Sequence, residues 1–538
     1  MSKPFVCASL VLFLLPLLAS CTQPQETASP MPAPSPSSPP GQEEQVLVLT
    51  LSAYDPPTLD PALCTDATSS FVIRQLYSGL VALDENLEVV PDLATGWSIS
   101  ADGRVYTFTL HPEARFHDGR PITSADFLYS LERACDPALG ENLPCATYLN
   151  DIVGVPEKLA GRADHIAGLR APDAHTLVIT IDGPKSYFLS KLTYNTAYVL
   201  DRNNVEQGRL WTEHPNGSGP FRLAEWQHNR RLVLARNEHD YRQPPRLEQV
   251  ILLMGAEARN PLLLYEQGRI DFAEVDTSSV ARLEYEGSPL AGELRVNPEL
   301  SLAYIGFNVQ MPPFDDPKVR QALTLAVDRA KIARVTYEGR LVQARGILPP
   351  GMPGYDETLE GLPYDPEQAR KLLAESRYAG KMPRLVFYTT GGGDAVLLQE
   401  VWQEELGLEV ELRQVVWADF LKGLDERRYP IFALGWIADY PDPQDFLEVL
   451  FRTGSPSNHT GYSNPEVDRL LEQAAVEQDE GKRLALYRQA ERLIVADAPV
   501  IPLTHGVTYS LTKPYVRGLQ VTPMGVLDLS TVWIEGRP

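Results

Sequence analysis

The amino-acid sequence predicts an α/β protein with two or three domains. Strands and helices alternate between residues 384 and 435, an order that favours a largely parallel sheet flanked by helices. The chain has 538 residues, which is too many for a single simple core even without its first 45. Its apolar fraction of 43% is ordinary for a globular protein, so the residues after position 45 are expected to fold.

The first residues predict export. Lys3 precedes an apolar run at 5–18, which is shorter than a membrane-spanning helix and fits a signal peptide. The run ends in Leu-Ala-Ser-Cys at 18–21, which resembles the lipobox of bacterial lipoproteins. This resemblance implies that 1–20 is a lipoprotein signal peptide and that acyl chains are attached to Cys21. The alternative, an ordinary secretory signal with a chance cysteine, also takes the rest of the chain out of the cytoplasm.

Residues 21–45 predict a tether. After the cysteine, this segment consists mainly of proline, serine and small polar residues that cannot build a core. Such a segment is extended and semi-rigid at ~3 Å per residue, so it could reach roughly 70 Å from a bilayer. The alternative is a tail without a mechanical role.

The charge and the cysteines limit the function. The formal net charge is −23, from 71 acidic and 48 basic residues, which argues against general nucleic-acid binding. Cys135 and Cys145 bracket a turn-rich loop, and an exported chain permits disulfides, so these two cysteines are predicted to be bonded. Cys64 is then expected to be buried and inert. No C-x-x-C pattern occurs, so neither a redox motif nor a structural zinc site is indicated.

Local patterns predict the elements of the first half of the chain. The run at 46–51 favours a strand, and apolar spacing favours a helix at 71–83. Alternating residues on both sides of an Asp-Gly turn at 102–103 favour a hairpin. Thr123 and Asp126 fit a capping box at the start of a helix.

In the second half, three helices are predicted to begin at a capping side chain followed by proline, at 316–317, 365–366 and 464–465. The last 40 residues return to β-like segments that include Val500–Leu503 and Val526–Val532. Between these regions, the alternating elements are strand Arg384–Thr390, helix Ala395–Leu406, strand Leu408–Val416, helix Asp419–Glu426 and strand Ile431–Gly435.

No catalytic or metal-binding pattern exceeds the background. The Asn-Gly-Ser-Gly-Pro sequence at 216–220 lacks the spacing of a nucleophile elbow and is better explained by a tight bend. The triglycine at 391–393 lacks a phosphate-loop ending and favours a strand-to-helix turn. His239 lies between two acids, but neighbouring residues on an extended chain point to opposite faces. The sequence therefore favours a binding protein without a metal or cofactor over an enzyme.

One ligand site is predicted from topology. Ligands of open α/β sheets bind beyond the carboxyl ends of the strands, and the strand at 431–435 leads into Trp436, Asp439 and Tyr440. The two aromatic residues offer flat apolar surfaces with polar groups, and the carboxylate can receive an ammonium group. Asp442 fits the helix-capping role before Pro443, which leaves Asp439 for the ligand.

Longer stretches resemble the extracytoplasmic peptide-binding proteins of ABC importers, the oligopeptide- and dipeptide-binding type. The resemblance covers nearly the whole chain after the tether, in the order of that family, with one departure at His111, where the family commonly carries lysine or arginine. It is carried by PDLATGWSISADGRVYTFTLHPEARFHDGRPITSADFLYSLER at 91–133, LDP at 59–61, NGSGPF at 216–221, YIGFN at 304–308, DDPKVRQALTLAVDR at 315–329, WIADYPDP at 436–443 and APVIPL at 498–503.

The resemblance implies a periplasmic-binding-protein-like fold with two lobes and an extra third domain. Lobe I would comprise 46–85, 215–308 and 501–538, the extra domain 86–214, and lobe II 309–500. The chain would cross between the lobes near Asn308 and near Val500–Leu503, which makes a two-strand hinge that closes over the ligand.

The resemblance also implies the function. A peptide would lie extended between the lobes, pair its main chain with protein strands and place its ammonium group on Asp439. The matching contact positions are Tyr148, Gly435, Trp436, Asp55, Asn308 and Trp417. Tyr148 and Trp417 have the alternative of core aromatics, and Asn308 of a cap on the hinge strand.

The implied partners are a peptide, the importer's permease and ATPase complex, and a membrane through the N-terminal lipid, with no nucleic acid. A monomer on the extracytoplasmic face of the membrane is expected. Relatives of the same fold bind nickel complexes, oligosaccharides or other solutes, and an extracytoplasmic peptidase is the alternative from another class. An acid at position 439 favours a ligand with a free amine.

Overall fold

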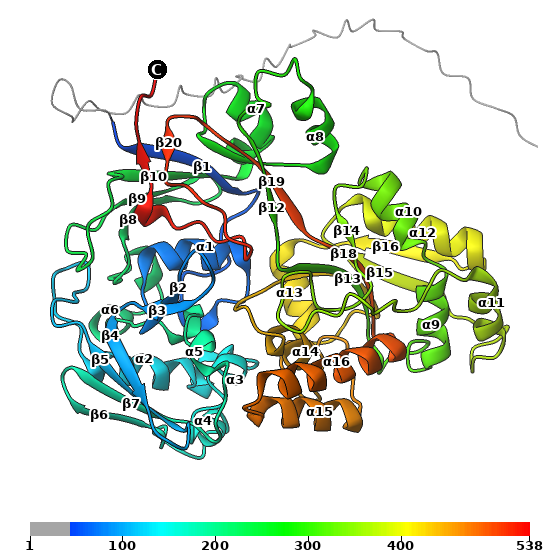
Figure 1. Cartoon of the computed structure of the whole chain (residues 1–538), viewed down its shortest axis with the longest axis horizontal. Coiled ribbons are helices and arrows are strands. Elements are labelled where there is room, and N and C mark those ends of the chain that lie inside the picture. The colour runs from blue at the N-terminus through cyan, green and yellow to red at the C-terminus, as the bar shows by residue number, and fades with distance from the viewer. Residues whose placement is uncertain (1–43) are drawn as a thin grey trace, which may run out of the picture. The chain divides into compact units, whose positions relative to one another are not determined.

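A seven-stranded mixed sheet forms the centre of lobe I in the computed structural model, which describes residues 44–538 (Figure 1). Strand β1 pairs in parallel with β10 and β11, and the outer strands are antiparallel. The expected signal peptide, most of the tether and Cys21 lie outside the described residues. In spatial order the strands are β12 (Leu294–Pro298), β19 (Val507–Thr512), β11 (Phe272–Val275), β1 (Val46–Ser52), β10 (Gln249–Met254), β9 (Arg231–Arg236) and β8 (Phe221–Gln227).

Short elements cover this sheet and complete lobe I. The helical elements are η1 (Pro61–Leu63), α1 (Ala67–Leu76), η5 (Gly255–Ala258), α7 (Pro261–Glu266), α8 (Thr277–Glu284) and η7 (Leu529–Thr531). The small strand pair β20 (Val516–Arg517) with β21 (Trp533–Ile534) belongs to this lobe, whereas the pair β2 (Val81–Leu83) with β3 (Val89–Pro91) packs Val81 and Val89 in the core of the extra domain. No helix within 44–538 is both long enough and apolar enough to cross a bilayer.

The extra domain contains an antiparallel sheet with its own apolar core. The predicted hairpin forms around Gly103, whose φ of 70° suits a residue without a Cβ, and the predicted capping box of Thr123 and Asp126 is present. The strands are β4 (Ala94–Ile99), β5 (Val105–Leu110), β7 (Thr176–Thr180) and β6 (Leu169–Asp173). The helical elements are α2 (Ser124–Ala134), η2 (Pro137–Leu139), α3 (Cys145–Tyr148), α4 (Val155–Leu159), α5 (Phe188–Lys191), η3 (Asn195–Ala197), α6 (Arg202–Val205) and η4 (Trp211–Glu213).

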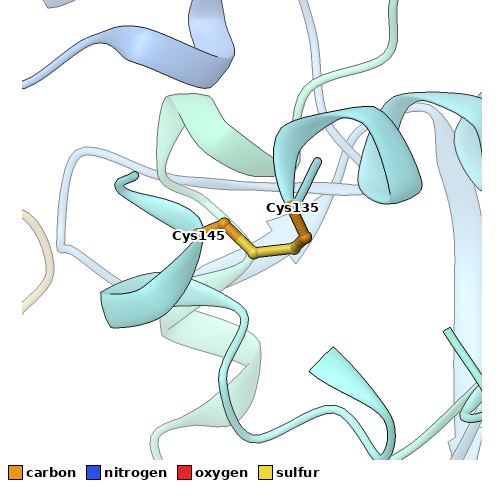
Figure 2. The surroundings of a disulfide bond; sticks show 2 residues. All are labelled: Cys135 and Cys145. Carbon is orange, nitrogen blue, oxygen red and sulfur yellow. A yellow bond between two sulfur atoms is a disulfide. The ribbon is translucent and has the colours of Figure 1, made fainter. Parts of the chain in front are cut away.

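A disulfide joins the end of α2 to the start of α3 (Figure 2). It connects Cys135 and Cys145, the pairing expected from the sequence, with Cα atoms 5.3 Å apart. Cys64 is the free cysteine of the described residues and is fully buried. Burial raises the pKa of its thiol to about 12, so Cys64 is inert at neutral pH, as expected.

Lobe II contains a six-stranded sheet that is mixed, which corrects the largely parallel sheet predicted from the alternating pattern. Only β15, β16 and β17 run parallel, while β13, β18 and β14 add antiparallel pairs. In spatial order the strands are β14 (Val342–Gln343), β18 (Val500–His505), β13 (Ser301–Phe307), β17 (Ile431–Ile437), β15 (Leu385–Thr389) and β16 (Val410–Gln414).

The helices of lobe II begin where the capping residues predict. Asp316, Asp365 and Asn464 each accept a hydrogen bond from a main-chain N–H of the first turn, with proline at the first helical position. The helical elements are α9 (Pro317–Leu325), α10 (Arg329–Lys331), η6 (Ile332–Thr336), α11 (Pro366–Ala374), α12 (Gly393–Leu406), α13 (Trp417–Asp425), α14 (Gln444–Phe451), α15 (Pro465–Val476) and α16 (Glu480–Asp497).

Two pairs of consecutive strands carry the chain between the lobes. Strands β12 and β13 are separated by Glu299 and Leu300, and β18 and β19 by Gly506 (Figure 1). The pairs lie side by side, because β12 pairs with β19 and β13 with β18. The crossing is therefore at 299–300 and 506. The expected positions, Asn308 and Val500–Leu503, lie in or beyond the strands of the lobe II sheet.

Two other predicted elements are wrong. The helix expected at 71–83 is α1 at Ala67–Leu76. The chain then becomes extended at Tyr77 and enters β2, so the apolar residues that predicted one helix belong to a helix and a strand. The segment expected to be β-like at Val526–Val532 forms no strand: it contains an isolated bridge at Leu527 and the 3-10 turn η7, capped by Asp528. The expected turns are correct: Gly392, with a φ of 101°, is the N-cap of α12, and Gly219 donates its N–H to the carbonyl of Leu76 in a bend.

Candidate ligand site

The site begins at the carboxyl end of β17. This strand runs to Ile437, two residues further than predicted, and it pairs with β13 along its whole length. On its other side β15 pairs only with Ile431 and Phe432, so no strand of residues 44–538 occupies that edge from Ala433 onwards. Gly435 is exposed on this stretch. The arrangement leaves main-chain groups of β17 available for an added extended chain.

Asp439 follows β17 and contacts the extra domain. Its Oδ2 accepts a hydrogen bond from the hydroxyl of Tyr148, the last residue of α3. The side chain is half-buried, and within the described residues it forms no ion pair. A carboxylate with little access to water and no cation is costly for the folded protein. The sequence therefore folds an acid into a place where an incoming cation would stabilise it.

The pKa of Asp439 reflects this cost. Burial raises the pKa to about 6, while the hydrogen bond from Tyr148 and the positive charge of Arg74 on α1 lower it. A cationic ligand would favour the ionised form and lower the pKa further. Arg74 donates from Nε to Ser70 Oγ at 3.3 Å and forms no ion pair with Asp439.

Tyrosine rings enclose one side of the site. Tyr148 is stacked on Tyr194 with ring centroids 3.7 Å apart, and it meets Tyr440 edge-on at 6.4 Å. Tyr194 donates to the carbonyl of Cys64 at 3.3 Å, and Tyr440 donates to the side chain of Gln444. Tyr440 is fully buried, so it supports the other rings from within the core and offers no free surface to a ligand.

Trp436 is held by a second acid. Its Nε1 donates to Asp445 Oδ2 at 3.1 Å, and the main-chain N–H of Asp439 donates to the same oxygen at 3.0 Å. The N-cap of α14 is Pro443, one residue later than expected, but Asp442 Oδ1 still accepts from the N–H of Gln444, the first residue of the helix, at 2.9 Å. Sequence reasoning missed Asp445, since an acid in the first turn of a helix is common and usually interacts with its own helix.

The three remaining predicted contacts differ in their environment. Trp417 begins α13, and its indole N–H is buried without an acceptor within 44–538, so it could donate to a ligand. Asp55 instead accepts from Trp226 Nε1 at 3.3 Å and from the N–H of Asn229 at 2.8 Å in the β8–β9 turn. Asn308 is buried and bonded to the carbonyl of Arg427 at 2.8 Å. For Asp55 and Asn308, these hydrogen bonds within the protein account for the side chain without a ligand.

The disulfide lies next to this site. Cys145 begins α3 and Tyr148 ends it, so the bond to Cys135 fixes the short helix that carries the hydrogen bond to Asp439. Closing a loop of ten residues is expected to contribute about 2–3 kcal/mol to stability.

Reduction should therefore lower the melting temperature by several degrees and weaken ligand binding, as measured by thermal denaturation and calorimetry with and without dithiothreitol. A Cys135→Ala/Cys145→Ala variant should be insensitive to the reductant, whereas Cys64→Ala should respond as the wild type does. Equal stability of reduced and oxidised wild type would contradict this role.

The comparison with protein families identifies the fold. The family model described as "Bacterial extracellular solute-binding proteins, family 5 Middle" matches residues 88–458. The chain belongs to this family. Three Escherichia coli relatives, named as deoxycholate-, murein peptide- and oligopeptide-binding periplasmic proteins (YgiS, MppA and OppA), are 33%, 30% and 30% identical to it. The matches cover 86%, 91% and 88% of this chain and 89%, 94% and 90% of the relatives.

Solved structures of family 5 members confirm the two-lobed α/β fold with an extra domain. Escherichia coli MppA aligns with a TM-score of 0.86 at 29% identity, covering 92% of this chain and 99% of the other. Haemophilus influenzae OppA in complex with the peptide RPPGFSPFR aligns with a TM-score of 0.84 at 25% identity, covering 92% and 100%. The unliganded open form of MppA aligns less well, with a TM-score of 0.65 at 28% identity and coverage of 92% and 98%.

The lower score for the open form agrees with the contacts between lobe II and the extra domain. Besides Tyr148 and Asp439, Gln478 Nε2 donates to the carbonyl of Pro184 at 3.0 Å, and the Arg483 guanidinium lies 5.6 Å from the ring centroid of Tyr187. The arrangement of lobe II and the extra domain is therefore less like the unliganded open form than like the other two structures, and it places Asp439 against Tyr148.

Proposed function

We propose that this chain is the lipid-anchored substrate-binding protein of an ABC importer and that it captures peptides by their free amino end. The single observation that carries the proposal is the half-buried carboxylate of Asp439, which has no cation among residues 44–538. The amino terminus of a peptide supplies that cation, and its N–H groups make charge-assisted hydrogen bonds to the carboxylate. The peptide-binding names of relatives such as OppA agree with this assignment.

The main chain of the ligand would add to the free edge of β17 near Gly435. Hydrogen bonds to a backbone do not depend on side-chain identity, so this contact suits a receptor that accepts varied sequences. The indole N–H of Trp417 is a further donor for a ligand carbonyl group. Closure would then enclose the amino end between Asp439 of lobe II and Tyr148 of the extra domain.

The cellular setting of this function is part of the proposal. Extracytoplasmic capture is followed by delivery to a permease and ATPase complex, with the protein working as a monomer held to the membrane through Cys21. The binding protein itself needs no metal, cofactor or nucleic acid for this task. No chemical change of the peptide is part of the cycle.

A second ligand class is an anionic amphiphile, which the deoxycholate-binding name of YgiS favours at 33% identity. Asp439 and Asp445 argue against it, because two acids without a cation in the described chain would repel a carboxylate. Nickel complexes and oligosaccharides fit less well, since neither needs an acid that receives an ammonium group.

The test is a ligand panel measured by thermal shift and calorimetry. Short peptides with a free amino end should raise the melting temperature and remain intact in mass spectra, while N-acetylated copies, deoxycholate, a nickel–histidine complex and maltotriose should have little effect. Native mass spectrometry of the purified protein should detect co-purifying peptides. Stronger stabilisation by deoxycholate, or cleavage of the peptides, would overturn the proposal.

A further inference from the structure

Asp445 is an acid of a helix first turn whose contacts and burial are unusual. It lies in the first turn of α14, its side chain is fully buried, and its Oδ2 accepts from Trp436 Nε1 and from the N–H of Asp439. Its Oδ1 is buried as well and has no hydrogen-bond donor in residues 44–538. An ordinary helix-capping acid would satisfy its own first turn; Asp445 instead fixes two residues of the candidate ligand site.

Within the described chain, no ion pair balances the charges of Asp439 and Asp445. Neither Asp439 nor Asp445 forms an ion pair there, and the neighbouring Asp442 is already matched by Arg483 at 2.5 Å. Two adjacent buried acids that are both ionised repel each other. Burial, and then the charge of Asp439, accordingly raise the pKa of Asp445 well above its usual range.

The other groups that face the pair do not titrate near neutral pH. Tyr148 of α3, Tyr194 of η3, Tyr440 and Cys64 have pKa values raised by burial, so they remain neutral. The positive charge of Arg74 of α1 lowers the pKa of Asp439. Burial also raises the pKa of Asp442, but its partner Arg483 is present with or without a ligand. The Asp439–Asp445 pair is thus the group that can exchange a proton when the site is filled.

Resting on the proposed function, we propose that Asp445 is the second acid of the ammonium site: it positions Asp439 and Trp436, and the two acids share one proton that leaves when the amino end of a ligand enters. The O–H bond of the protonated carboxyl group breaks, its proton passes to the buffer, and the ligand keeps its own ammonium protons. The filled site then holds two carboxylates and one ammonium group, which favours a fully charged amino end over a neutral one.

Proton release is measured directly by calorimetry in two buffers of different ionisation enthalpy. A single acid with the pKa of Asp439, about 6, is mostly ionised near pH 7 and would release about one-tenth of a proton. The shared proton instead predicts release of about half to one proton per free-amine peptide near pH 7. This wild-type count tests the proposal without any substitution, and a count near zero would overturn it.

Asp445→Asn is the matched variant. Its amide oxygen can still accept from Trp436 and from Asp439, so the fold of the strand end should persist, whereas the charge and the shared proton are lost. The variant should release less than about one-quarter of a proton near pH 7 and bind free-amine peptides roughly tenfold more weakly. If the proton count and affinity equal those of the wild type, Asp445 is only structural and the proposal fails.

The proposed function is judged by a different comparison in the same experiment. If the wild type binds free and N-acetylated peptides equally, the ammonium site itself is wrong. If it prefers the free amine but Asp445→Asn leaves the proton count unchanged, only the role of Asp445 is wrong. An exposed acid of lobe II without an ion pair in the described chain, changed as Glu480→Gln, should leave affinity and proton count unaltered.

Discussion

Replacing Asp439 by asparagine is expected to weaken the binding of free-amine peptides by about 2–5 kcal/mol, or ~30- to several-thousand-fold. The physical reason is that the ligand's ammonium group would be buried without its counter-charge, while the substituted amide could offer only a neutral acceptor. Binding of N-acetylated peptides should change by less than about threefold, because these ligands never formed the ion pair. Calorimetry of the wild type and of Asp439→Asn, each with a free-amine and with an N-acetylated peptide, isolates the coupling free energy between the carboxylate and the ammonium group.

Loss of folding cannot account for this effect. The carboxylate of Asp439 is half-buried and has no cation in the described residues, so its charge is a cost to the unliganded protein. Because folding raises its pKa to about 6, the ionised group destabilises the fold above that pH. Asp439→Asn should therefore keep or increase the free energy of unfolding near pH 7. Equal losses for free and acetylated peptides would contradict the assigned role.

The largest expected effect on stability is at Asp151 in the extra domain. This buried acid binds two lysines, with Oδ1 2.5 Å from Lys185 Nζ and Oδ2 2.5 Å from Lys191 Nζ, and Lys191 is fully buried. Asp151→Ala would leave both ammonium groups without this partner. Removing one member of a buried ion pair costs about 3–5 kcal/mol, so chemical denaturation should show a loss of that size.

The pH dependence of this loss has a definite sign. Burial alone would raise the pKa of Asp151, but Lys191 and Lys185 outweigh it and the pKa lies below its usual range. A depressed pKa means that the stabilisation is complete above the unfolded pKa of about 4 and is lost as the pH falls further. The difference between wild type and Asp151→Ala should therefore be full near pH 7 and shrink in stronger acid.

The same cluster contains a matched control. Asp182 also binds Lys185, at 3.0 Å, but 58% of its side chain is exposed. Exposed pairs contribute little, so Asp182→Ala should cost less than about 1 kcal/mol. If both substitutions destabilised the protein equally, burial of the Asp151 pair would not be the source of its stability.

Patterns that depend on neighbouring residues predicted the fold well. The helix starts at Asp316, Asp365 and Asn464 follow from capping side chains and proline, which act within one turn. Strand β17 was predicted for the same reason, and the start of α14 was predicted to within one residue, because both signals lie within a few residues.

Partners distant in the sequence explain the errors. Strand β13 pairs with β18, almost 200 residues away, and no local pattern encodes this pairing or its antiparallel direction. For this reason the sequence predicted a largely parallel sheet in lobe II, and the chain was expected to cross between the lobes near Asn308. The helix expected at 71–83 failed similarly, because its later apolar residues pack in a different hydrophobic core.

The candidate site could be predicted only in part. Asp439 was placed correctly at the end of a strand, but its partner Tyr148 comes from another domain and entered through family resemblance. Asp55 forms hydrogen bonds with Trp226 and Asn229 at the β8–β9 turn, which is distant in the sequence, so no local pattern reveals them. Asp445 was missed because its distinctive feature, a buried oxygen without a donor in the described chain, exists only in three dimensions.

A crystal structure of the protein with a tripeptide that has a free amino end tests the central claim most directly. A half-buried acid without a counter-ion in the described chain predicts an ammonium nitrogen roughly 2.7–3.0 Å from an oxygen of Asp439, beneath the hydroxyl of Tyr148. A peptide bound with its amino end elsewhere, and with Asp439 still lacking a cation, would contradict the account.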